Sequence, residues 1–167
     1  IYSPGENNGY WTHHASAKIR EQLNGMQPEN IDIEGIISRC SKEVHVSELF
    51  RVMESIGFNY GSAFRGLQQI HVGKGEAIAH ISVTNGVNPE AYRVHPALLD
   101  AAFQALIVVA SNSLERNAFS GPIFPVSIEK VRYQAAASGN FRAYIRVREG
   151  TGNSLMEGDV FLIDDAG

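Results

Sequence analysis

The sequence predicts an α+β domain in which an antiparallel sheet wraps around one long, buried helix. Residues 97–113 are apolar on nearly every side, which is typical of a helix that is covered all round. Residues 141–148 alternate between apolar and polar side chains, which is typical of a strand with one face towards a core. Several other short apolar runs flank the helix, and they supply the remaining strands.

The strands follow from these shorter runs. Residues 67–72 and 76–83 both favour a strand, and the glycines between them predict a hairpin. Two further strands are expected at residues 126–133 and 155–163.

The helices have recognisable ends. Pro96 predicts the start of the long helix, because proline suits the first helical position. Ser47 is expected to cap a short helix that runs to Ile56 and stops at Gly57. Together, one buried helix and an antiparallel sheet around it make the hot-dog fold.

The first part of the chain is expected to lie outside this unit. Residues 10–19 favour a strand, and no segment before them is expected to pair with it. Residues 20–43 are mostly polar with scattered isoleucines, which predicts an extended linker. The expected division is therefore an end strand at 1–19, a linker at 20–45 and one domain at 46–167.

Composition excludes several classes of protein. With 167 residues, 44% apolar and 19% charged, the chain fits one soluble domain. A net charge of -4 argues against nucleic acid as a partner, and no apolar run reaches the roughly 20 residues that span a bilayer. The single cysteine excludes an internal disulfide and favours a reducing, cytoplasmic location. No His/Cys spacing is typical of a metal site.

Asp100 is the most informative residue, because it lies in the first turns of the apolar helix. Burial favours the neutral acid, whereas the helix N-terminus favours the carboxylate, so the sequence leaves the balance open. Gln104 follows one turn later on the same face, where it can orient a general acid. The alternative is that Asp100 serves the helix terminus and Gln104 fills space.

Two further residues allow a functional and a structural interpretation. His95 is either a catalytic base or, as we favour, a boundary residue fixed by the following proline. Tyr60, in a glycine-rich stretch, either anchors a tight loop or presents its hydroxyl to a pocket.

Several segments together resemble one family. Residues 95–104, HPALLDAAFQ, resemble the DxxxQ helix of the second hot dog in polyketide synthase dehydratase domains. Residues 60–66, YGSAFRG, are similar to that family's YGPAFxG segment, and residues 124–131, FPVSIEKV, to its LPFSW segment. WTHHA at 11–15 looks like the strand that closes the first hot dog, and FLIDDAG at 161–167 like a late strand.

The resemblance implies a dehydratase that acts on a β-hydroxyacyl group carried on the phosphopantetheine of an acyl carrier protein. Asp100 is then the general acid and Gln104 its orienting neighbour. No metal or organic cofactor is implied. The residues that the resemblance places at the substrate are Tyr60, Gly61, Phe64, His95 and Pro125.

The chain also departs from the family pattern. Ser62 stands in place of a proline and Ile128 in place of a tryptophan. The family's base motif, HxxxGxxxxP, is missing, since the nearest string, at 71–80, ends in histidine and falls on the predicted hairpin. We therefore expect the catalytic histidine on a separate N-terminal hot-dog half, and this chain alone to be inactive.

The expected partners are that N-terminal half, the acyl carrier protein and other synthase domains. A second copy of the chain, in a homodimer, is a further option. Two alternatives stay open. The same acid and base could shift a double bond or close a pyran ring. Otherwise the chain is a non-catalytic scaffold or docking module.

Overall fold

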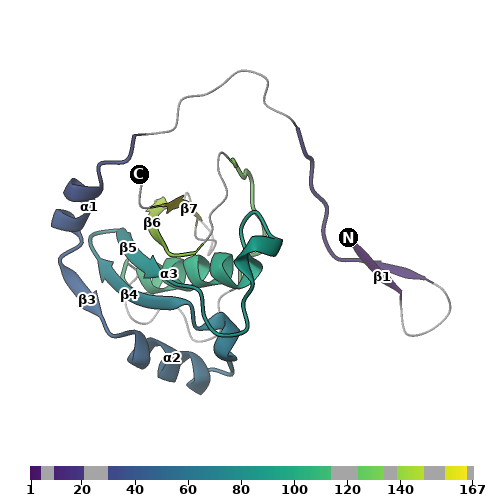
Figure 1. Ribbon diagram of the computed structural model, residues 1–167, viewed down its shortest axis with the longest axis horizontal. Coiled ribbons are helices and arrows are strands. Elements are labelled where there is room, and N and C mark those ends of the chain that lie inside the picture. Colours follow the sequence, from purple (N-terminus) through teal and green to yellow (C-terminus); the bar gives the residue numbers. More distant parts are fainter. Residues whose placement is uncertain (5–9, 21–29, 114–123, 134–138, 149–156, 165–167) are drawn as a thin grey trace.

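The computed structural model describes residues 1–4, 10–20, 30–113, 124–133, 139–148 and 157–164. Within these ranges the centre of the fold is a five-stranded antiparallel sheet with α3 (Pro96–Ser113) lying against one face (Figure 1). The strands follow the order β3 (Lys42–Val44), β4 (Leu67–Val72), β5 (Glu76–Ile81), β6 (Phe141–Arg148) and β7 (Glu157–Ile163).

The predicted hairpin is confirmed as the antiparallel pair β4–β5. Gly75 adopts a φ of 71°, which glycine tolerates without strain, and the amide of Gly73 donates to the carbonyl of Glu76 at 2.8 Å. β5 ends at Ile81, two residues earlier than the pattern predicts.

The long helix is also confirmed, with Pro96 as its first residue. α3 packs against β4, β5, β6 and β7, so its apolar residues and the inner face of the sheet form one core. The largest side chains in that core that are almost fully buried are Leu67, Ile70, Ile81, Leu98, Val109, Phe141 and Ile145.

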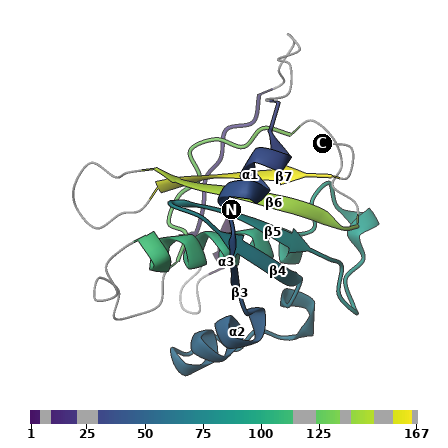
Figure 2. The same ribbon diagram turned by 90° about the vertical axis from the view of Figure 1, so that its left-hand side faces the viewer.

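The outer face of the sheet is covered as well, which the sequence analysis did not predict. Phe141, Ala143 and Ile145 face α3 as expected. Tyr144, on the opposite side of the alternating pattern, is only 8% exposed, because it lies in one apolar cluster with Ile36 of α1 (Ile33–Arg39). Figure 2 shows α1 in front of the sheet. A second apolar cluster fills this layer and consists of Ile36, Cys40, Ile78, Tyr144 and Ile163.

The extended linker expected at residues 20–43 is therefore wrong for its second half. The Asp32 carboxylate caps α1 by accepting from the amide of Gly35 at 2.9 Å, and β3 pairs with β4. The scattered isoleucines are the buried side of α1, and a helix this short gives too few turns for a clear periodicity.

The short helix, α2 (Val46–Ser55), begins two residues earlier than predicted. Its cap is His45, whose carbonyl accepts from the amides of Glu48 and Leu49, so Ser47 is not the N-cap. Phe50 and Met53 are buried, whereas Ile56 is 42% exposed. The predicted stop is confirmed, since Gly57 adopts a φ of 97°.

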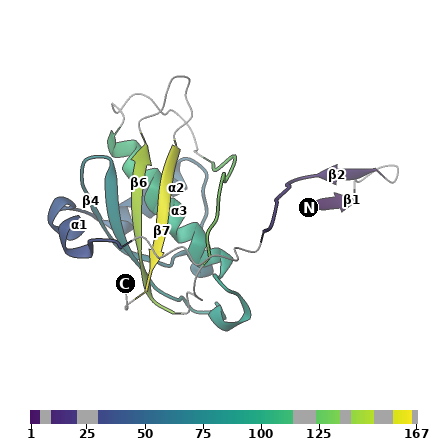
Figure 3. The same ribbon diagram turned by 90° about the horizontal axis from the view of Figure 1, so that it is seen from above.

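Two strand predictions are wrong, the first in its extent and the second altogether. β2 covers only Trp11–His13 and pairs with β1 (Tyr2–Pro4), so an earlier segment does supply a neighbour. This small hairpin stands away from the main sheet (Figure 3). Residues 126–133 form no strand and are exposed along their length. Residues 155 and 156 of the last predicted strand lie outside the described ranges.

In the described part of the chain, no helix has both the length and the apolar character needed to cross a membrane.

Candidate active site

Asp100 and Gln104 lie one turn apart on α3, and their side chains meet. The Gln104 Nε2 donates to the Asp100 Oδ2 at 2.8 Å and to the backbone carbonyl of Phe64 at 3.0 Å. Gln104 is 1% exposed and Asp100 is half-buried. The convergence predicted from the spacing is therefore confirmed, and Gln104 does more than fill space.

The two acceptors fix the direction of the amide. Because both acceptors are oxygens, the nitrogen of Gln104 must face them, and each of its two hydrogens has a partner. The Gln104 Oε1 is buried and accepts no hydrogen bond from the described residues. A buried oxygen that accepts no hydrogen bond lowers the stability of the fold.

The N-terminus of α3 is capped by His95 and not by Asp100. The His95 Nδ1 accepts from the amide of Ala97 at 3.1 Å, and its carbonyl accepts from the amides of Leu98 and Leu99. The ring also packs edge-on against Tyr92, with centroids 4.7 Å apart. The boundary interpretation of His95 is therefore confirmed, and its contact with substrate stays a prediction.

Tyr60 lies close enough to Asp100 for the two groups to interact electrostatically. Burial raises the pKa of the Tyr60 phenol, and the negative charge of Asp100 raises it further. Its ring stacks on Phe58 at 5.8 Å and meets Phe50 edge-on at 5.9 Å. Tyr60 is thus both the loop anchor and a neighbour of the carboxylate.

The remaining candidates reach the site in different ways. Gly61 precedes a single 3-10 turn (Ser62–Phe64) that contacts α3. Phe64 contributes its backbone carbonyl, while its side chain is 42% exposed. Pro125 is exposed, and its neighbour Phe124 lies 5.2 Å from the ring of Phe58. Substrate contacts of Gly61, Phe64 and Pro125 stay predictions.

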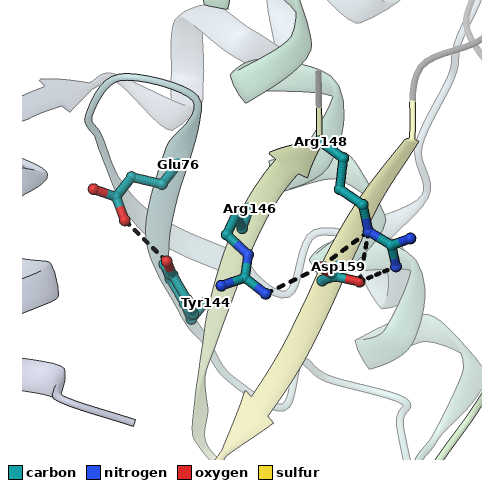
Figure 4. Close-up of polar contacts among 5 residues, drawn as sticks. All are labelled: Glu76, Tyr144, Arg146, Arg148 and Asp159. Atoms are coloured by element: carbon teal, nitrogen blue, oxygen red, sulfur yellow. Dashed lines mark hydrogen bonds and ion pairs between the residues drawn. The ribbon is translucent and has the colours of Figure 1, made fainter. Parts of the chain in front are cut away.

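A second polar cluster lies on the outer face of the sheet, where α1 covers it. The Glu76 carboxylate accepts from the Arg39 guanidinium at 2.7 and 3.1 Å and from the Tyr144 hydroxyl at 2.9 Å. Figure 4 shows the contact between Glu76 and Tyr144 and, beyond Arg146, Asp159 of β7, which pairs with Arg146 and Arg148 of β6. Arg39 is the main cause of a pKa of Glu76 below its ordinary value.

A pocket of about 140 Å³ adjoins this outer cluster and is lined in part by Arg39, Tyr144 and Phe161. It lies across the sheet from Asp100. Since its charged groups are already paired, it offers less chemistry than the Asp100 region. The described residues contain no group of three His, Cys, Asp or Glu side chains arranged for a metal ion.

Comparison with known proteins identifies the family. Residues 31–167 match the family model described as the polyketide synthase dehydratase N-terminal domain. Mycoketide-CoA synthase of Mycobacterium tuberculosis is 31% identical over 87% of this chain and 3% of its own length. A highly reducing polyketide synthase of Pyrenophora dematioidea is 27% identical over 93% of this chain and 7% of its own length.

Solved dehydratase structures share the fold. The dehydratase domain from the CurF module of curacin polyketide synthase aligns with a TM-score of 0.75 and 27% identity, covering 99% of this chain and 57% of that one. The CurK dehydratase aligns with a TM-score of 0.71 and 28% identity, covering 84% and 49%. The chain thus spans about half of these structures and a small part of its curated relatives.

These matches confirm the predicted hot-dog fold, while the assignment to the second of two hot dogs stays a prediction. The matches, the α3 helix and the antiparallel sheet agree: the chain belongs to the polyketide synthase dehydratase family.

Proposed function

We propose that this chain is the acid-bearing half of a dehydratase that removes water from a β-hydroxyacyl group on an acyl carrier protein. The observation that carries the proposal is the hydrogen bond from Gln104 to Asp100, held in turn by the carbonyl of Phe64. A half-buried carboxylate with an oriented amide beside it is suited to deliver a proton to a leaving oxygen.

The two oxygens of Asp100 have different roles in this proposal. Oδ2 accepts from Gln104, and no residue in the described ranges donates to Oδ1. Oδ1 then carries the proton to the β-hydroxyl. The carbon–oxygen bond breaks, the hydroxyl leaves as water, and a base takes the α-proton as the double bond forms. The thioester carbonyl acidifies that α-proton, so positioned acid–base groups suffice and we propose no cofactor.

We infer that the base is a histidine on a preceding N-terminal half. Solved CurK dehydratases include one inactive mutant with an aspartate replaced by asparagine and another with a histidine replaced by phenylalanine. In that protein the histidine precedes the aspartate by more residues than precede Asp100 here. This supports an acid on the present chain, in the C-terminal half, and a base before it.

The curated relatives are named as polyketide synthases, and each is many times longer than this chain. We therefore propose that the chain works within a larger synthase, with an acyl carrier protein and other synthase domains as partners. A homodimer and a cytoplasmic location also stay predictions.

The test is to offer the complete dehydratase domain a β-hydroxyacyl carrier protein and to follow the acyl mass. We expect the loss of one water, abolished by Asp100→Asn because the required general acid is lost. Asp32→Asn is the matched control, since an asparagine can still cap α1 and the residue lies on the other side of the sheet.

The possible results distinguish a dehydratase from an isomerase or cyclase and from a non-catalytic scaffold. Unchanged turnover in Asp100→Asn would overturn the assignment of the acid. A product of unchanged mass that depends on Asp100 would support the isomerase or cyclase. No reaction in the complete domain would support the scaffold.

A further inference from the structure

The loop at residues 60–66 is held through its backbone carbonyls. Every carbonyl in it accepts a hydrogen bond, although the loop forms only one short turn. The donors, in carbonyl order from residue 60 to 66, are Arg65 Nε, Phe64 N, Arg65 N, Thr84 Oγ1, Gln104 Nε2, Gln68 Nε2 and Ser82 N. A loop bonded at each carbonyl has little freedom to rotate its peptide planes.

Thr84 is the donor that the sequence gives no reason to expect. It lies shortly after β5, is half-buried, and donates its hydroxyl to the carbonyl of Ala63 at 3.1 Å. The next carbonyl along the loop, that of Phe64, is the one that holds Gln104. Ala63 and Phe64 both lie in the 3-10 turn, whose backbone hydrogen bonds limit rotation about the Cα of Phe64, so fixing the first carbonyl restricts the second.

We propose that Thr84 is a positioning residue for the acid. It holds the carbonyl of Ala63, and this keeps the neighbouring carbonyl of Phe64 aimed at the amide of Gln104, which in turn holds Asp100. The effect on catalysis rests on the proposed function, whereas the effect on Gln104 does not.

The close contact of the loop with α3 makes this link effective. A methyl group added at Gly66 would lie 3.1 Å from the carbonyl of Ser82, 3.5 Å from Leu98 and 3.6 Å from Ala101. The loop therefore lies directly against the helix that carries the acid, and a small rotation of its carbonyls changes the geometry at Gln104.

The kinetic test uses the complete domain with Thr84→Val, which keeps the shape of the side chain and removes the donor. We expect kcat to fall about fivefold, the effect of one neutral hydrogen bond, with KM nearly unchanged. Thr84→Ser retains the hydroxyl and should restore kcat.

The matched control is Ser111→Ala, which removes a hydroxyl that donates to the carbonyl of Ile107 at 2.9 Å, further along α3. A purely structural role of Thr84 predicts that both variants lower the unfolding midpoint and leave kcat unchanged. That result would overturn the inference.

A second measurement does not depend on activity. The side-chain amide signal of Gln104 in a ¹⁵N NMR spectrum can be identified by its loss in Gln104→Met. Thr84→Val should shift this signal and Ser111→Ala should not. An unmoved signal overturns the positioning role even if Asp100→Asn abolishes water loss, whereas absence of water loss in the unaltered domain refutes only the proposed function.

Discussion

On each face of the sheet a carboxylate lies near a tyrosine. The two carboxylates differ in the side chain that donates a further hydrogen bond to them. On the outer face, Glu76 accepts from Tyr144 and is neutralised by Arg39. On the inner face, Asp100 lies near Tyr60 and accepts from Gln104, an amide without charge. A cation holds a carboxylate in its ionised form, whereas an amide orients it without neutralising it. The comparison separates a charge-paired carboxylate that fastens α1 to the sheet from a carboxylate that only an uncharged amide orients.

The largest expected difference is in turnover. Asp100→Asn should lower kcat of the complete domain by about 10²- to 10⁴-fold, the usual contribution of a general acid. Glu76→Gln, the matching change on the outer face, should leave kcat unchanged and lower the unfolding midpoint, because it removes the charge that pairs with Arg39. Equal losses of kcat in both variants would break the comparison.

The outer pair should also make stability depend on pH. The pKa of Glu76 lies below its ordinary value of 4.5, so the unfolded chain binds the proton more readily than the folded one. The stabilisation is therefore fully present above pH 4.5 and is lost as the pH falls through the folded pKa. Denaturant unfolding across this range should show a weaker pH dependence in Glu76→Gln. Asp159, whose pKa is lowered chiefly by Arg148, contributes in the same direction and remains in the variant.

The smallest effect concerns the ionisation of Tyr60. Its pKa is raised above the ordinary value of 10.0 by burial and by the charge of Asp100. Asp100→Asn removes the second cause, so the pKa of Tyr60 should fall towards its ordinary value while remaining above it. An absorbance titration, with Tyr60→Phe to isolate the signal of this one tyrosine, measures the change. An unaltered titration would show that Tyr60 and Asp100 are too far apart to interact.

The side-chain contact on the inner face of the sheet could be predicted from the sequence, whereas the burial of the outer face could not. Asp100 and Gln104 could be predicted because two polar residues one turn apart stand out in an apolar helix. The burial of Tyr144 could not be predicted from the alternation of β6, since it depends on a helix about a hundred residues earlier in the chain. The isoleucines of α1 were the available signal.

The contacts that the backbone makes in the candidate site could not be predicted from the sequence either. The carbonyl of Phe64 and the hydroxyl of Thr84 carry no sequence signature, because their roles arise from contacts between distant segments. The irregular course of residues 126–133 shows the same limit, since a strand-like pattern forms a strand only where a neighbouring strand pairs with it.

Gln104 is held by a main-chain oxygen, and this determines which substitutions the site can tolerate. Any residue at position 64 presents the same carbonyl, so the aromatic ring there can be exchanged without removing the hydrogen bond that holds Gln104. Substitutions at this position can therefore change the exposed side chain while the contact between Gln104 and Asp100 is kept.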